Sequence, residues 1–278
     1  MLGTDSRRAL PNADRVSVLA ATILLAYALT RYVNLPPREL STQLFGIYLS
    51  IPLNVQTVVS LLVAGLTAAG AYWLVLDHPA LRAKTARRLL GIQHWLLPAL
   101  TSWAIGVPLS QLPYDPVWWA GLAMGGIVLV LILTAEYIVI NPNDIRYPLA
   151  ASWLTAVSFA LYLILAIALR VGGFRLYLIL PAMALGAGVV SLRTLNLRLH
   201  GEWPIIEAGL VTLIIGQFSA ALHYIPLSPI SFGLATLGPV YALVNLIGSL
   251  ADGKQLGQAL LGPMLTVLAA WGSAWWIG

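Results

Sequence analysis

The most constraining feature of this sequence is a series of apolar runs, each about twenty residues long, separated by short segments that hold nearly all of the charge. A helical run of about 20 apolar residues spans the roughly 30 Å hydrocarbon layer of a bilayer. Backbone polar groups in that layer need partners within the segment, so these runs must be helices. The strands of membrane barrels alternate in polarity over about ten residues, and these runs do not alternate.

Composition supports the same class of protein. Apolar residues make up 59% of the 278 residues, and charged residues only 9%. Because a soluble domain carries about 25% charged residues, this chain cannot cover a water-exposed surface of the ordinary kind. The absence of cysteine excludes disulfides, thiolate nucleophiles and cysteine-ligated metal centres.

We predict an all-α polytopic transmembrane helix bundle of about nine spans, forming one integral membrane domain over residues 1–278. The predicted spans are Val16–Val33, Val55–Leu76, Leu89–Leu109, Val117–Val139, Pro148–Leu169, Leu176–Asn196, Ile205–Tyr224, Ile230–Leu250 and Leu256–Ile277. The segments between them are too short for a separate soluble domain. A total of eight or ten spans stays open, mainly because of the segment Leu40–Asn54.

The segment Leu40–Asn54 alternates between apolar and small or polar residues, which indicates an extended backbone. An extended backbone cannot face lipid, because its hydrogen-bonding groups would lack partners. We therefore expect an interfacial loop that covers helix ends, or a re-entrant piece that lines a pore or cavity.

The distribution of basic residues predicts the orientation. With a cytoplasmic N-terminus, eleven of the fifteen Lys and Arg residues fall on the cytoplasmic side, and the reverse orientation inverts this ratio. Tryptophans at predicted span ends, such as Trp118, Trp203 and Trp275, fit the headgroup level that amphipathic rings prefer. We therefore expect a multi-pass protein of the cell inner (cytoplasmic) membrane.

Ionisable groups inside a membrane cost about 2.5–3.5 kcal/mol, so they mark candidate sites. Glu136 lies in the last turn of the fourth span, where it is a proton or cation site, reaches the cytoplasmic interface, or pairs with Arg146. Glu207 lies in the first turn of the seventh span, where a helix N-terminus favours negative charge. Gln217 projects about 80° away from Glu207 around the same helix, so the two can border one cavity.

The pair Gln93–His94 lies one turn into the third span. Histidine is both a metal ligand and a pH switch, although near an interface it often only makes hydrogen bonds. The four histidines, His78, His94, His200 and His223, lack the H-x-x-x-H or H-E-x-x-H spacing of a metal site. The sequence therefore predicts no metal and no cofactor.

Basic residues near the predicted cytoplasmic span ends form a second group of candidates. They are Arg82, Arg87, Arg88, Arg193 and Arg198. The positive-inside rule alone accounts for them, or they bind the phosphate-bearing headgroups of anionic lipids. The expected partners are the lipid bilayer, its anionic headgroups, and a membrane-protein partner or a second copy of the chain, but not nucleic acid.

Three classes of function remain open. Proline-interrupted spans, at Pro98, Pro181 and Pro239, suit a transporter or channel-like protein for a lipidic or weakly polar small molecule, because broken helices can line cavities. Short loops and scarce buried charge suit a non-catalytic membrane subunit or scaffold that binds pigment or lipid. An intramembrane lipid-modifying enzyme ranks third, since no catalytic constellation is visible in the sequence and we assign no catalytic residue.

Overall fold

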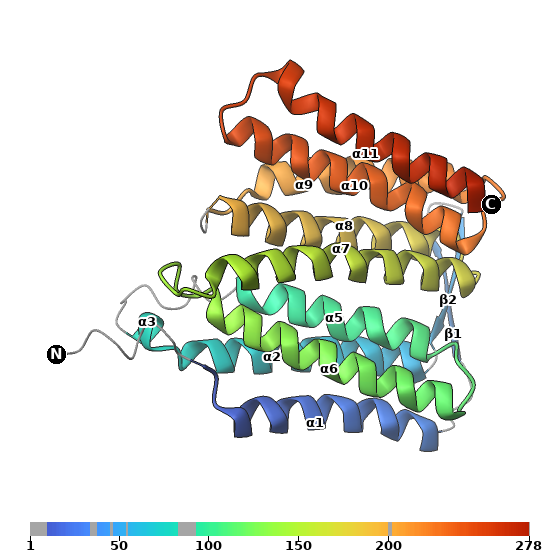
Figure 1. The fold of residues 1–278 in the computed structure, drawn as a ribbon. Helices are drawn as coiled ribbons and strands as arrows, with labels where there is room; N and C mark the ends of the chain where they lie inside the picture. The colour runs from blue at the N-terminus through green and yellow to red at the C-terminus, as the bar shows by residue number, and fades with distance from the viewer. Residues whose placement is uncertain are drawn as a thin grey trace.

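A computed structural model describes residues 10–33, 38–44, 47–53, 55–82, 93–199 and 202–277. Figure 1 shows a bundle of long helices within these ranges. The long helices are α1 (Ala13–Leu29), α2 (Val55–Leu76), α5 (Gln93–Leu109), α6 (Pro116–Ile138), α7 (Tyr147–Val171), α8 (Leu176–Arg198), α9 (Ile205–His223), α10 (Pro229–Ala251) and α11 (Leu256–Ile277). Two short helical segments are η2 (Thr30–Tyr32) and α3 (Pro79–Arg82).

Successive long helices run in opposite directions, and α1 begins at the opposite end of the bundle from the end at which α11 stops (Figure 1). In the described ranges, seven helices, α2 and α6 to α11, are long and apolar enough to cross a membrane. The other two, α1 and α5, have 17 residues each. The prediction of a polytopic helical membrane bundle is therefore confirmed.

The segment between α1 and α2 contains an antiparallel hairpin of β1 (Arg38–Leu44) and β2 (Ile47–Leu53). The extended backbone that the alternating sequence predicted is thus confirmed for these residues, whereas Phe45, Gly46 and Asn54 lie outside the described residues. Figure 1 places the hairpin at one end of the bundle, which matches the interfacial alternative. We call this the hairpin end, and the opposite end, where α5 begins, the Gln93 end.

Local signals explain where several helices begin. The Asp115 side chain accepts hydrogen bonds from the backbone N–H groups of Val117 and Trp118, at 2.9 and 3.1 Å, and caps α6. The Ser228 side chain caps α10 in the same way through the N–H of Ser231. A proline follows each capping residue, at a position where a helix has no use for an N–H.

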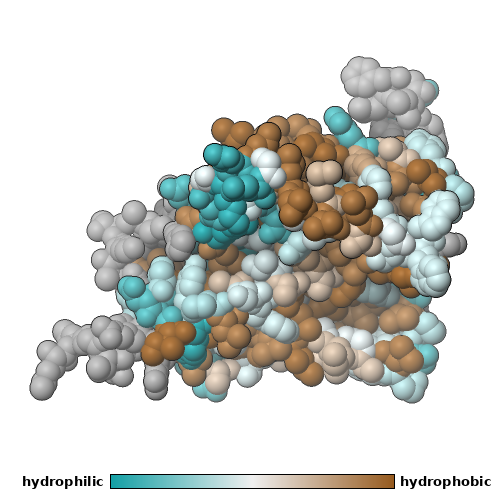
Figure 2. All heavy atoms as spheres, turned by 45° about the horizontal axis from the view of Figure 1, so that its top comes forward, coloured by the Kyte–Doolittle hydropathy of each residue, from teal (hydrophilic) through white to brown (hydrophobic). Residues whose placement is uncertain are grey.

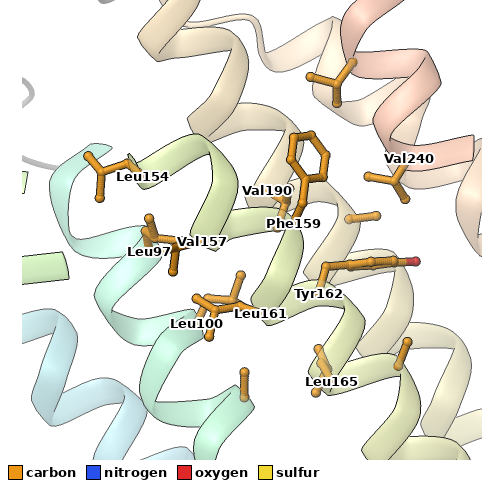
Figure 3. Packing of buried hydrophobic residues seen from close by; sticks show 14 of the residues in the cluster. Leu97, Leu100, Leu154, Val157, Phe159, Leu161, Tyr162, Leu165, Val190 and Val240 are labelled. Atoms are coloured by element: carbon orange, nitrogen blue, oxygen red, sulfur yellow. The ribbon is translucent and has the colours of Figure 1, made fainter. Parts of the chain in front are cut away.

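Two groups of buried apolar side chains hold the bundle together. One joins α1, α2 and α6, and includes Ile23 and Leu133. The larger group joins helices α5 to α10. Figure 3 shows part of it, with Leu97 and Leu100 of α5 beside Val157 and Leu161 of α7. Because lipid is as apolar as these side chains, close packing rather than water exclusion holds such helices together.

The outer surface is largely apolar, and Figure 2 shows hydrophobic residues over the sides of the helices, with hydrophilic ones gathered toward the Gln93 end. Helix α11 is the most exposed of the seven: only 6% of its apolar window is buried, against 56% for α7. It therefore lies at the edge of the bundle, packed on α10.

The contact between α10 and α11 depends on Gly238. A Cβ added there would lie 2.7 Å from the Cβ of Ala270, and neither atom can move without its backbone. We expect Gly238→Ala to force the two helices apart and to destabilise the protein by about 1–3 kcal/mol, measured as thermal unfolding in detergent. Gly262→Ala, whose Cβ meets nothing described within 4 Å, is the control, and equal stability of both variants would contradict this packing.

Candidate functional site

Polar side chains from three helices meet inside the bundle at the Gln93 end. Gln93 and His94 begin α5, Glu136 lies in the last turn of α6, and Arg193 and Asn196 lie near the end of α8. The side chains of Glu136 and Arg193 are each only 1% exposed, and that of His94 is 3% exposed. Helices of opposite direction thus bring together residues that are far apart in the sequence.

An ion pair between Glu136 and Arg193 is the centre of this group. The Nε of Arg193 donates to Oε1 of Glu136 at 2.8 Å, and Nη2 donates to Oε2. This two-bond geometry matches the planar guanidinium to the planar carboxylate. Each buried charge therefore has its partner, without which burial would be costly.

The second carboxylate oxygen also contacts His94, whose Nδ1 lies 2.9 Å from Oε2 of Glu136. The other ring nitrogen of His94, Nε2, lies 3.2 Å from the side-chain nitrogen of Gln93. Both imidazole nitrogens thus have polar neighbours inside the bundle.

Asn196 closes the group into a ring. Its Oδ1 accepts a hydrogen bond from Nη1 of Arg193 at 2.9 Å, and its Nδ2 donates to Oε1 of Gln93 at 2.9 Å. The same Nδ2 donates to the backbone carbonyl of Glu202 at 2.7 Å. We call the closed cycle of Gln93, His94, Glu136, Arg193 and Asn196 the polar ring.

The orientation of Asn196 follows from its two fixed neighbours. Arg193 can only donate, so it must face the Asn196 oxygen, and the Glu202 carbonyl can only accept, so it must face the Asn196 nitrogen. The nitrogen of Asn196 then requires the oxygen of Gln93 as its acceptor. The Gln93 nitrogen is consequently turned toward His94.

This orientation assigns the tautomer of His94. The Gln93 nitrogen donates to Nε2, which must therefore carry a lone pair. Nδ1 then carries the hydrogen and donates to the Glu136 carboxylate. The polar ring is fully satisfied when His94 is neutral, Glu136 is ionised and Arg193 is protonated.

His78 lies beside the polar ring, in the segment between α2 and α3. Its side chain is 2% exposed, and its ring packs edge-on against Tyr137 with centroids 4.6 Å apart. Burial, followed by the positive charge that His94 can carry, lowers the pKa of His78 to about 4, although Asp144 acts in the opposite direction. His78 is therefore neutral at physiological pH.

Asp144, not Glu136, is the ion-pair partner of Arg146. The Nε and Nη2 of Arg146 donate to the Asp144 carboxylate at 3.1 and 2.9 Å. The structure thus pairs Glu136 with Arg193 of α8 and gives Arg146 a partner within its own turn.

A groove of about 430 Å³ lies on another side of α8, between α7 and α10. It is lined by Ala151, Ser152, Thr155, Ala156, Phe159, Thr194, Leu197, Arg198, Tyr241, Val244 and Asn245. The hydroxyl of Thr194 is buried and has no hydrogen-bond partner among the residues that the structure describes. The groove combines an apolar wall with a few polar atoms.

The structure brings together three of the five predicted polar candidates, Gln93, His94 and Glu136. The other two do not join them: Glu207 is half-buried in the first turn of α9, and Gln217 is exposed on the same helix. Neither residue lines the groove.

The prolines inside the helices were expected to line a cavity, but they do not line the groove. Pro98, Pro181 and Pro239 lie inside α5, α8 and α10, and none of them lines the groove. The expectation of a cavity at the helix interruptions does not match this groove, because its walls are formed by regular helical segments instead.

The basic candidates fall into three groups. A headgroup contact would require Arg193 to lie on the surface. Instead, Arg193 is buried and paired with Glu136. Arg198 is 30% exposed, pairs with Asp252 at 2.5 Å and lines the groove. Arg87 and Arg88 lie outside the described residues, and Arg82 is described only as part of α3.

The fold is that of a multi-pass helical membrane protein. Its long apolar helices alternate in direction, its outer surface is apolar, and its few charges lie near the helix ends. The chain belongs to the family described as "Protein of unknown function (DUF5656)", which matches residues 35–277. Comparisons with curated proteins and with solved structures gave no match. The polar ring and the groove therefore carry the functional argument.

The ion pair makes a prediction about stability. Arg193→Met leaves the Glu136 carboxylate buried without its cation, and we expect a loss of about 3–5 kcal/mol, measured by thermal unfolding in detergent. Adding Glu136→Gln to this variant removes the orphaned charge and should restore most of the loss. Arg198→Met, which breaks a half-exposed pair, should cost only about 0–1 kcal/mol; a similar cost at both arginines would contradict the burial argument.

The low pKa of His78 predicts a dependence on pH. Above pH 6.5 the residue is neutral in both the folded and the unfolded protein, so its contribution is constant. Between pH 6.5 and about 4 only the unfolded state binds the proton, so stability falls as pH falls, by up to about 1.4 kcal/mol per pH unit. His78→Phe should reduce this slope of stability against pH, and an unchanged slope would show that His78 titrates normally.

Proposed function

We propose that this protein binds a lipidic or weakly polar small molecule and moves it within or across the membrane, as a transporter or channel-like protein. The observation that carries the proposal is the groove between α7, α8 and α10. Its volume, about 430 Å³, lies within the roughly 300–1,000 Å³ of small-molecule sites.

The lining supports a ligand that is mostly apolar. Phe159, Leu197 and Val244 offer hydrocarbon and aromatic surface, which suits an acyl chain or a ring system. Thr194 adds a buried hydroxyl without a partner among the described residues, and a ligand carbonyl or hydroxyl group would satisfy it. A few fixed polar atoms in an apolar wall are typical of sites that orient a weakly polar ligand.

The polar part of such a ligand would lie toward the Gln93 end. Arg198 and Asn245 line the groove there, and the Arg198 guanidinium is shared with Asp252. An anionic headgroup could use the remaining donors of Arg198, as expected for basic residues near a charged lipid surface.

The proposed setting is the inner (cytoplasmic) membrane, with the Gln93 end facing the cytoplasm. The support is the bias of Lys and Arg toward the segments at that end. The proposed partners are the bilayer and its anionic headgroups.

A second candidate function, a non-catalytic subunit or scaffold, is favoured by α11. Only 6% of its apolar window is buried, and Leu261, Leu265 and Leu268 are exposed along it. This surface suits lipid, and it would equally suit a membrane-protein partner or a second copy of the chain.

Photocrosslinking tests the groove. A diazirine-labelled phosphatidylglycerol and an equally labelled diacylglycerol would be irradiated with the protein in vesicles, and the adducts located by mass spectrometry. We expect adducts on the groove residues of α7, α8 and α10, and a loss of about tenfold in Ala156→Trp, whose indole fills the groove, because such sites enclose most of their ligand.

The control is Ala160→Trp, the same exposed substitution one turn along α7 and outside the groove lining. It should keep the adducts. Two results would overturn the transport proposal in favour of the subunit. One is labelling that is unchanged in Ala156→Trp, and the other is labelling along α11 together with a partner protein that stably co-purifies.

A further inference from the structure

We propose that His94 is a proton-binding site, and that its protonation breaks the hydrogen bond by which the polar ring joins α5 to α8. The link to cargo rests on the proposed function of the groove, whereas the proton site itself rests only on the geometry of the ring. The ligand is a proton, and its acceptor atom is Nε2 of His94.

The ring offers one place where a proton can be added without displacing a charged partner. The Glu136 oxygens already accept bonds from Arg193 and from Nδ1 of His94. Nε2 of His94 accepts only the single bond from Gln93. A proton on Nε2 would turn this contact into two donors that face each other.

Gln93 can relieve this repulsion between two donors only by rotating its carboxamide, so that its oxygen accepts a hydrogen bond from the imidazolium. Its nitrogen would then face Nδ2 of Asn196, again a donor against a donor. Asn196 cannot follow, because Arg193 fixes its oxygen and the Glu202 carbonyl fixes its nitrogen. The bond between Gln93 and Asn196 is therefore lost.

That bond is the hydrogen bond of the ring between α5 and α8. The other close approach, 3.3 Å between Nη2 of Arg193 and Nδ1 of His94, joins two donors in the assigned tautomer. After protonation, the ring keeps α6 tied to α8 through Glu136 and Arg193, but α5 is no longer tied to Asn196.

The charges that face His94 come from several elements. Glu136 of α6 and Arg193 of α8 contact it directly and cancel each other. His78, from the segment after α2, interacts with it through space and is itself near Asp144 of the turn before α7.

Tyr147 at the start of α7 interacts with Arg193. Because Glu136 and Arg193 already neutralise each other, an imidazolium at position 94 would give the group a net positive charge. Its nearest stabilising contact is the hydrogen bond to Glu136.

Helix α8 carries this change to the groove. Arg193 and Asn196 face the polar ring, while Thr194 and Leu197, which alternate with them in the same turn, line the groove. Release of Asn196 from α5 therefore alters the wall of the groove, and proton uptake would be coupled to the ligand it holds.

The test uses the absence of native cysteine. Leu97→Cys places a reporter one turn below Gln93 on the same face of α5, at a fully buried site, and Leu165→Cys places a matched control on α7 toward the hairpin end. Figure 3 shows both leucines in the core. The labelling rate with a small methanethiosulfonate reagent would be measured from pH 8 to pH 5, and divided by the rate of a free cysteine peptide.

We expect the relative rate at position 97 to rise as pH falls, by up to about tenfold per pH unit, as one linked proton allows. The rate at position 165 should stay low. A flat profile at position 97 would overturn the proposal, and a parallel rise at both positions would show general unfolding and also overturn it.

Two variants of Gln93 sharpen the result. In Gln93→Glu the carboxylate accepts from both the imidazolium and Asn196, so the reporter should stay protected at pH 5. In Gln93→Ala the bridge is missing, so labelling should be fast at every pH. If Gln93→Glu responds to pH like the native residue, the assigned mechanism is wrong.

The groove crosslinking separates this proposal from the proposed function. If the reporter at position 97 responds to pH but no adducts form in the groove, the proton site is supported and ligand binding in the groove is rejected. If adducts form in the groove but the reporter does not respond to pH, the proton site is rejected and ligand binding in the groove is still supported.

Discussion

The ion pair between Glu136 and Arg193 is the interaction on which the arrangement of the Gln93 end depends. Two charges in a bundle that faces lipid can be buried only if each compensates the other and the remaining hydrogen-bonding positions are filled. The two-bond pairing meets the first need, and His94 and Asn196 meet the second. The ends of α6 and α8 must therefore lie at one depth, and α5 must begin beside them.

Much of the fold could be predicted from the sequence, because length and polarity of an apolar run decide whether it can span a membrane. The alternating residues of Leu40–Asn54 likewise indicated the extended backbone of the hairpin. Glu136, Gln93 and His94 stood out because polar and ionisable residues inside the predicted spans are scarce. Their contacts could not be predicted, since apolar runs do not encode which helices are neighbours. Arg146 is close to Glu136 in sequence, but Asp144 binds it, and the positive-inside rule already accounted for Arg193.

Helix α8 connects the two features that the structure offers for function. Its last turns present Arg193 and Asn196 to the polar ring and Thr194 and Leu197 to the groove. A helix that is held by side-chain hydrogen bonds on one side and lines a ligand-sized space on another is suited to couple the two, because it moves as one unit. No such coupling is available to Glu207 or Gln217, which lie outside both features.

The direction of the hydrogen bonds matters more to this coupling than their number. Arg193 and the Glu202 carbonyl have fixed roles, one as donor and one as acceptor, and they transmit these roles through Asn196 to Gln93. The chain of assignments ends at Nε2 of His94, which is left as a base inside the bundle. A ring of apolar residues would hold the helices as firmly, but it could not distinguish a protonated state from a neutral one. Four of the five polar side chains are buried and Gln93 is half-buried, and what these side chains add over an apolar contact is a site that responds to one proton.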